Sequence, residues 1–222
     1  MMAQPNVDQL IRQTRKYEFS DGLRDLQGAV LLGIGGIAVW IGFEPIWITF
    51  VGNMVKAYGR WVASIIMLPM ILAMLAVWGM LYLMRIIRRH WLWQESGMVK
   101  PSLWIVMRQI NILSAIILIG GVVLGYGARY VGFADDTFVL RMLWVATGWS
   151  FGYTLDAVGH NIGLTRYMRI GVLGGIFSTG MLFLPLSFSQ TALVFGLSWC
   201  LLLLVSGIVT LRHAILAVKA GK

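Results

Sequence analysis

The chain is poor in charged residues. Asp, Glu, Lys and Arg make up only 12% of its 222 residues, whereas a soluble domain typically carries about a quarter. Hydrophobic residues reach 59%. A soluble protein of this composition would have too little polar surface to present to water. The composition therefore argues against an ordinary soluble domain and favours a protein whose solvent is the lipid bilayer.

Cysteine and catalytic motifs are equally scarce. Cys200 is the only cysteine, so an intramolecular disulfide and a thiol-rich metal site are both excluded. We expect Cys200 to behave as a small buried hydrophobe. There is no phosphate-binding loop, HExxH or GxSxG motif, and the three histidines are far apart in sequence. The sequence therefore indicates no metal, cofactor or catalytic residue and favours a non-enzymatic role.

Long apolar stretches are present instead. They predict an all-α, six-helix transmembrane bundle with spans at about 23–43, 61–84, 110–130, 137–159, 170–186 and 191–211. A loop is expected through Ile46–Val55, in which the apolar segment Ile46–Val51 is too short to cross and dips into the outer interface. Pro69 should kink the second span, because proline lacks the backbone N–H of a helical hydrogen bond. No cleavable signal peptide is expected before the first span.

Residues 1–22 and 212–222 flank the transmembrane domain. Apolar residues recur at helical spacing from Val7 to Tyr17, with basic residues between them. This pattern predicts an amphipathic helix on the cytoplasmic membrane surface; a frayed tail is the alternative, because the segment is short. Residues 212–222 are expected to form a cytoplasmic tail.

The basic residues are concentrated in alternate gaps between the spans. Of the 18 Lys and Arg residues, only Lys56, Arg60, Arg129 and Arg141 fall on the expected outer side. Lys and Arg are enriched in cytoplasmic loops of membrane proteins. The distribution therefore predicts a multi-pass protein of the bacterial inner membrane with both termini in the cytoplasm. The same explanation accounts for the net charge of +9 without invoking nucleic acid.

The basic residues beside spans 2, 3 and 5 form a candidate docking surface. Tryptophans lie between several of them, and aromatic and basic residues together beside spans are typical of anchoring at headgroup level. We expect this surface to bind anionic lipid or a soluble cytoplasmic subunit. Its members are Arg85, Arg88, Arg89, Lys100, Arg108, Arg166 and Arg169.

Asp156 and His160 are a candidate polar pair. They are four residues apart, so they share a helix face. A carboxylate and an imidazole could form a proton relay. However, both residues are expected near the cytoplasmic boundary of the fourth span. There Asp156 could instead be hydrated or pair with Arg166 or Arg169.

Glycines four residues apart predict close helix packing. The candidate pairs are Gly121 and Gly125, Gly148 and Gly152, and Gly171 and Gly175. We expect packing within the monomer, and a homo-oligomer interface is the alternative.

Three segments resemble a group of bacterial six-span membrane proteins of unassigned function. The segment Tyr17–Gln27, YEFSDGLRDLQ, is similar to the opening of that group. The segment Gln94–Pro101, QESGMVKP, resembles its YPRTGYVKP-type element, and Gly163–Ile170, GLTRYMRI, resembles a basic, aromatic patch. The resemblance implies a bacterial integral membrane protein and brings no reaction with it.

The sequence leaves three functions open. The favoured one is a non-catalytic membrane component that docks a soluble partner or anionic lipid through its basic cytoplasmic face. The second is a small transporter for an apolar or amphipathic solute, with a path between the spans that contain Pro69 and Gly171. The third is an intramembrane lipid-modifying enzyme that uses Asp156 and His160.

Overall fold

The computed structural model describes residues 22–87, 104–133 and 135–220, and these residues are almost entirely helical, with no β-strand. The elements follow one another as α2 (Leu23–Phe43), α3 (Pro45–Tyr58), η1 (Arg60–Met67), α4 (Leu68–Ile87), α5 (Trp104–Tyr130), α6 (Asp136–Ile162), α7 (Thr165–Gly180), η3 (Met181–Phe183) and α8 (Phe188–Ala220). The predicted all-α class is confirmed. The predicted N-terminal amphipathic helix lies outside the described residues.

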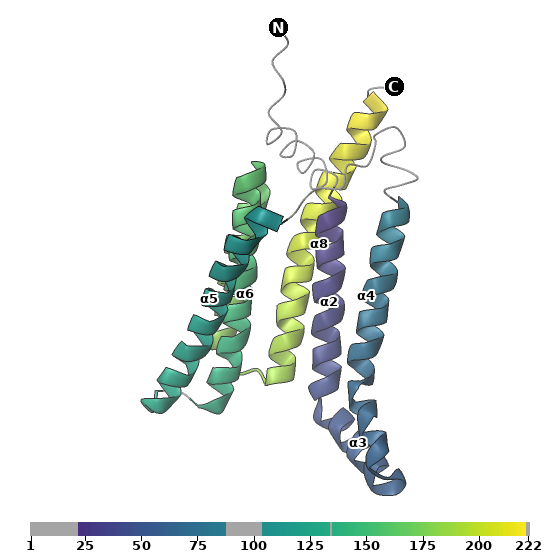
Figure 1. Cartoon of the computed structure of the whole chain (residues 1–222), viewed down its shortest axis with the longest axis vertical. Helices are drawn as coiled ribbons and strands as arrows, with labels where there is room; N and C mark the ends of the chain where they lie inside the picture. The colour runs from purple at the N-terminus through teal and green to yellow at the C-terminus, as the bar shows by residue number, and fades with distance from the viewer. Residues whose placement is uncertain (1–21, 88–103, 134, 221–222) are drawn as a thin grey trace.

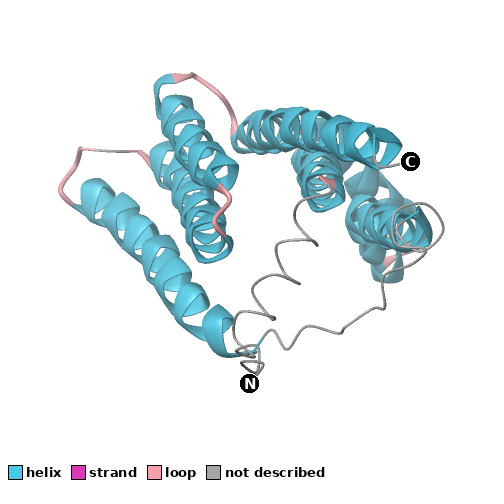
Figure 2. Cartoon of the chain, turned by 90° about the horizontal axis from the view of Figure 1, so that it is seen from above, coloured by secondary structure: helices cyan, strands magenta, loops and turns pink. Residues whose placement is uncertain are grey.

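The long helices run up and down and stand side by side (Figure 1). Helix α2 packs mainly on α8 and α4, while α6 packs on α5 and α7. Helix α7 also contacts α8, which joins the two groups. Seen from above, the helices follow an arc from α5 through α6, α7, α8 and α2 to α4 (Figure 2). Helix α2 begins and helix α8 ends at the same end of the bundle (Figure 1).

Within the described residues, four segments are long and apolar enough to cross a membrane: Leu23–Phe43, Arg60–Ile87, Ile110–Tyr130 and Phe188–Leu216. Helix α6 carries Arg141 and Asp156 within a mixed sequence, and α7 has only 16 residues. Large apolar side chains cover the outside of α4 and α5; for example, Trp78 is 70% exposed. Such exposure is ordinary in lipid and unfavourable in water. The fold therefore fits a membrane-embedded protein.

The apolar core lies where α2, α7 and α8 meet. Its centre is the fully buried Trp199, with Ala29, Ile170, Phe195 and Leu203 around it. The Trp199 indole N–H donates a hydrogen bond to Ser178 Oγ at 3.2 Å. The ring lies directly against Gly174, where any side chain would collide with it. A glycine on α7 therefore makes room for the largest side chain on α8.

The local structure differs from the sequence prediction after the first span. The segment expected as a loop at Ile46–Val55 belongs to α3, which begins at Pro45; proline suits the first turn of a helix because no intrahelical bond needs its missing N–H. Pro69 lies inside the expected second span, which the structure has as the helical segment Arg60–Ile87, at the point where the 3₁₀ helix η1 passes into α4. Helix α8 continues through the expected tail from residue 212 to Ala220, and the cytoplasmic location of this tail stays a prediction.

The fifth predicted span is displaced along the sequence. Helix α7 covers Thr165–Gly180 instead of 170–186, and Pro185 lies in the short connection to α8. Gly163 has a φ of 75° and ends α6 in the left-handed conformation that glycine favours. The chain can therefore turn within a few residues, which places Arg166 in the first turn of α7 and not in a loop.

Candidate functional site

A buried carboxylate lies at the end of the bundle where α2 begins. Asp25 is in the first turn of α2 and is only 2% exposed. The turn starts at Gly22, whose φ is 75° and whose α-carbon lies against the backbone of Gly207. No side chain would fit at position 22, so these two glycines let α2 begin in direct contact with α8. This contact brings Asp25 into the interior of the protein.

Two helices, α7 and α8, supply the groups around this carboxylate. The Tyr167 hydroxyl, on α7, donates a hydrogen bond to Asp25 Oδ1. The Ser206 hydroxyl, on α8, donates one to Asp25 Oδ2 at 2.6 Å. Arg166 Nη2 lies 3.6 Å from Asp25 Oδ2 and forms an ion pair. Because a buried charge is unfavourable unless it is paired and hydrogen-bonded, these contacts explain how a carboxylate is tolerated here.

The arginine of this pair is held in place by further contacts. Arg166 Nη1 donates to the Thr210 hydroxyl, and Nη2 lies 3.4 Å from the Tyr167 hydroxyl. The guanidinium also lies 4.9 Å from the centre of the Tyr167 ring, within the range of cation–π attraction. We refer to Asp25, Arg166, Tyr167, Ser206 and Thr210 as the Asp25 cluster. It joins α2, α7 and α8 at one end of the bundle.

A second polar group links α5 and α6. The hydroxyls of Ser114 and Ser150 lie 2.5 Å apart, and Ser150 Oγ is 2.9 Å from the carbonyl oxygen of Ser114. Thr154 donates to the Ser150 carbonyl oxygen at 2.9 Å. Hydroxyl pairs of this kind connect helices in membranes. This group therefore holds the α5 and α6 pair together.

Asp156 and His160 are not brought together as a functional pair. Both are on α6, with Asp156 half-buried and His160 exposed. Within the described part of the chain, no hydrogen bond or ion pair joins them. Arg166, one of the expected partners of Asp156, pairs with Asp25 instead. Among the described residues there is also no cluster of His, Cys, Asp or Glu that could hold a metal ion.

The expected docking residues divide into three groups. Arg85 near the end of α4 and Arg169 near the start of α7 are exposed. Arg166 is mostly covered, because its side chain is 23% exposed within the Asp25 cluster. Arg108 belongs to helix α5, and Arg88, Arg89 and Lys100 lie outside the described residues.

Two further exposed arginines lie at the same end of the bundle, Arg24 at the start of α2 and Arg212 on α8. Neither was among the expected docking residues. Arg85, Arg169 and Arg212 form no ion pair with any residue that the structure describes. We call this end of the bundle, with these three arginines, the basic end.

The opposite end has a more balanced charge. Arg129 Nε pairs with Asp136 Oδ1 at 2.7 Å, and Arg141 Nε donates to the Leu186 carbonyl oxygen at 3.1 Å. Asp135 caps α6: hydrogen bonds from the Thr137 hydroxyl and the Phe138 N–H hold the pKa of its carboxyl below the ordinary value. Lys56 and Arg60 are the exposed basic residues of the α3 and η1 region.

The candidate packing glycines all contact neighbouring helices of the same chain. A β-carbon at Gly152 would lie 2.5 Å from the carbonyl oxygen of Gly171, so the two backbones touch. Gly175 lies against the Trp149 ring and Gly148 against Ser178. On the other side of α6, Gly121 faces Ala146 and Gly125 faces Met142. Close approach along α5, α6 and α7 therefore depends on these positions.

The expected solute path between the spans with Pro69 and Gly171 is not formed by neighbouring helices. Helix α4 packs on α2 and η1, whereas α7 packs on α6 and α8. The two spans are connected through α2 and α8 (Figure 2). The helix order therefore gives no support to that route.

Sequence reasoning missed Asp25 and Tyr167. A signal was available, because Asp25 lies three residues into a span expected to begin at Leu23, and an ionisable residue within a span is a candidate functional residue. The partners of Asp25 could not be predicted from the sequence, because Tyr167 and Ser206 belong to helices that are distant from α2 along the chain. No protein-family model, curated protein sequence or solved structure matches this chain.

Proposed function

We propose that this chain is a non-catalytic integral protein of the bacterial inner membrane that binds anionic phospholipid headgroups at its basic end. In this proposal the chain crosses the bilayer six times, through α2, the η1 and α4 segment, α5, α6, α7 and α8. Both termini are cytoplasmic. The four apolar segments support a membrane location. The arrangement of the helices and of their charges supports the six-span count and the orientation.

The positions of α6 and α7 support the six-span count. These two helices lie between α5 and α8 in the arc (Figure 2) and contact both sides. Helix α7 buries six of its residues, among them Tyr167, Gly171 and Ser178, whereas α4 buries only Met84. A helix with protein neighbours on two sides needs less apolar surface than one that faces lipid. This explains why α6 and α7 are less hydrophobic than the other spans.

The distribution of charge supports the orientation. Arg85, Arg169 and Arg212 lie at the basic end, and acidic residues balance much of the basic charge at the opposite end. Lys and Arg are favoured on the cytoplasmic side. The basic end is therefore assigned to the cytoplasm, where the membrane surface is negative.

The observation that carries the lipid proposal is the exposure of these three arginines on three different helices, with no carboxylate partner in the described part of the chain. A guanidinium presents a planar fork of donors that matches phosphate oxygens. Each basic residue near an anionic surface contributes about 1 kcal/mol. Three residues therefore suffice for a measurable preference for anionic lipid.

The test is the melting temperature of the purified protein in phosphatidylcholine vesicles with and without phosphatidylglycerol. We expect phosphatidylglycerol to raise the melting temperature at low salt, and added salt to reduce this shift. The triple variant Arg85→Gln, Arg169→Gln, Arg212→Gln should lose most of the shift.

The matched control is Lys56→Gln with Arg60→Gln, which removes exposed basic charge from the opposite end. This control should keep more of the shift than the triple variant does, because acidic residues already balance much of the basic charge at that end. An equal loss in both variants, or no response of the wild-type protein to phosphatidylglycerol, would contradict the proposal.

A further inference from the structure

Helix α8 extends beyond the point where α2 begins. Gly22, just before α2, lies beside Gly207 and Leu211 of α8. Helix α8 then continues to Ala220, which adds about 13 Å at 1.5 Å per residue. In the proposed orientation, the segment around Leu211 therefore lies where the acyl chains give way to the lipid headgroups.

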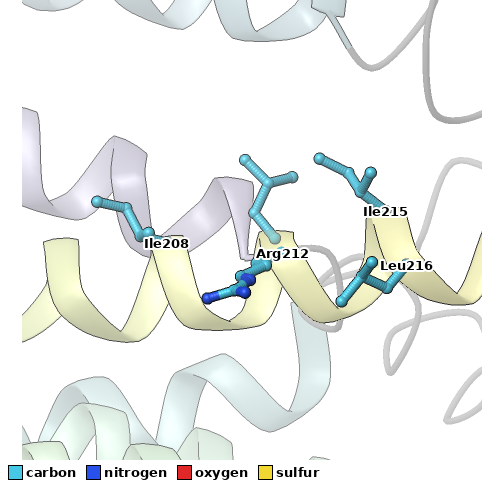
Figure 3. A pocket seen from close by; sticks show the side chains of 5 residues that line it. Ile208, Arg212, Ile215 and Leu216 are labelled. Atoms are coloured by element: carbon cyan, nitrogen blue, oxygen red, sulfur yellow. The ribbon is translucent and has the colours of Figure 1, made fainter.

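This part of α8 carries an open apolar groove. The residues that line it are Ile208, Leu211, Arg212, Ile215 and Leu216 (Figure 3). Their spacing of three and four residues places them on one face of the helix. Ile208 is 51% exposed and Leu216 is 53% exposed. The groove is thus almost wholly apolar: Arg212 lines it with its aliphatic stem, and its exposed guanidinium lies outside the apolar lining.

The size of the groove limits what it can hold. Its volume is about 260 Å³, below the roughly 300–1,000 Å³ of pockets that enclose small molecules. A groove of this size along a helix suits part of a chain-like molecule that remains partly in contact with its surroundings. Together with the arginine, it suits an amphipathic ligand with a negative head.

We propose that the groove binds one anionic phospholipid, a proposal that rests on the function proposed above. The phosphate accepts hydrogen bonds from the Arg212 guanidinium. An acyl chain lies against Ile208 and Leu211, on the membrane side of the arginine.

Ile215 and Leu216 continue the apolar lining on the cytoplasmic side of Arg212, and both side chains are exposed. One phospholipid can therefore contact the guanidinium with its phosphate and the apolar side chains with its acyl chain. Arg212 has apolar residues on both sides along α8. This site should therefore be more selective for an anionic phospholipid than Arg85 or Arg169 alone.

The test is native mass spectrometry of the full chain released from vesicles of phosphatidylcholine and phosphatidylglycerol. We expect one phosphatidylglycerol retained per wild-type protein. Arg212→Gln should lower its affinity about tenfold or more, because a hydrogen bond to a charged group is lost. Ile208→Trp fills the groove and should weaken binding similarly.

Two controls test whether these effects are specific to the groove. Val209→Trp places the same bulk at a residue of α8 that is 51% exposed and does not line the groove. Lys56→Gln removes an exposed charge from α3, at the opposite end of the bundle. Both variants should retain the bound phosphatidylglycerol.

The outcomes distinguish the two proposals. If the wild-type protein does not prefer phosphatidylglycerol to phosphatidylcholine, the function proposed above fails, and this site with it. If it does, but Arg212→Gln and Ile208→Trp retain the lipid as well as Val209→Trp does, only the groove assignment is overturned. Retention of phosphatidylcholine that is indifferent to Arg212→Gln would also overturn it.

Discussion

Replacing Asp25 with alanine should strongly destabilise the protein. The substitution removes the acceptor of the Tyr167 and Ser206 hydroxyls and the carboxylate that pairs with Arg166. Removing one member of a buried ion pair typically costs about 3–5 kcal/mol. Because the Arg166 side chain is 23% exposed, water can reach part of it. We therefore expect a loss of about 3 kcal/mol, at the lower end of the range.

Partial deletions of the cluster should have graded effects. Tyr167→Phe removes one donor to a charged acceptor and should cost about 1.5–3 kcal/mol. Ser206→Ala removes a hydroxyl between helices and should cost about 0.6 kcal/mol, as for typical hydrogen bonds between membrane helices. Because Tyr167 and Asp25 share one hydrogen bond, the combination Asp25→Ala with Tyr167→Phe should destabilise by less than the sum of the single changes.

The measurement is the free energy of unfolding in mixed micelles with increasing sodium dodecyl sulfate. Asp156→Ala is the matched control, because Asp156 is a half-buried carboxylate that makes no hydrogen bond or ion pair within the described part of the chain. It should change the free energy of unfolding by about 0.5 kcal/mol or less. If Asp25→Ala is no more destabilising than Asp156→Ala, or if the double variant is additive, the cluster does not join the three helices.

Three other predictions concern helix packing, a helix cap and a helix start. Gly152→Leu should destabilise the α6 and α7 contact by at least about 1–3 kcal/mol, because a β-carbon there meets the Gly171 carbonyl oxygen at 2.5 Å. The control Gly120→Leu, with no atom within 4 Å, should leave the melting temperature nearly unchanged. Equal effects of the two variants would refute the packing argument. Asp135→Ala should lower stability at neutral pH, because the folded pKa of Asp135 is depressed; the contribution of Asp135 is complete above the unfolded pKa and is lost as the pH falls through the folded pKa. The deficit of the variant relative to wild type should therefore shrink below about pH 4, and a deficit independent of pH in thermal melts would contradict this. Pro69→Ala should stabilise the protein by far less than the ~3 kcal/mol released when a proline conflict inside a helix is removed, because position 69 is in the first turn of α4; a large stabilisation in chemical unfolding would contradict this.

The sequence predicts the helices much better than their contacts. The first span was expected at 23–43, and α2 covers Leu23–Phe43, because hydrophobic length and a following Glu-Pro pair are local signals. The sequence predicts the fifth span at 170–186 because Arg166 and Arg169 suggest a polar gap, whereas α7 begins at Thr165. The mostly covered position of Arg166 depends on Asp25, a partner distant in sequence. Local patterns contain no information about such pairs.

The candidate sites illustrate the same limit. Asp156 and His160 were selected because residues four apart share a helix face, but a shared face does not bring in a partner from another helix. Asp25 carried a similar local signal, and only the approach of α2 to α8 through Gly22 and Gly207 makes it buried. The spacing of glycines predicts helix contacts better. Gly152 and Gly171 let two backbones touch because they have no side chains, so no specific polar partner is needed.

The most direct test of the proposed function is purification from the native membrane in a gentle detergent at low salt, followed by mass spectrometry of the copurified molecules. We predict anionic phospholipid enriched over its share of the membrane, lost from the variant Arg85→Gln, Arg169→Gln, Arg212→Gln and retained with Lys56→Gln, Arg60→Gln. A stoichiometric soluble subunit without enriched anionic lipid would contradict the account. So would identical lipid in both variants.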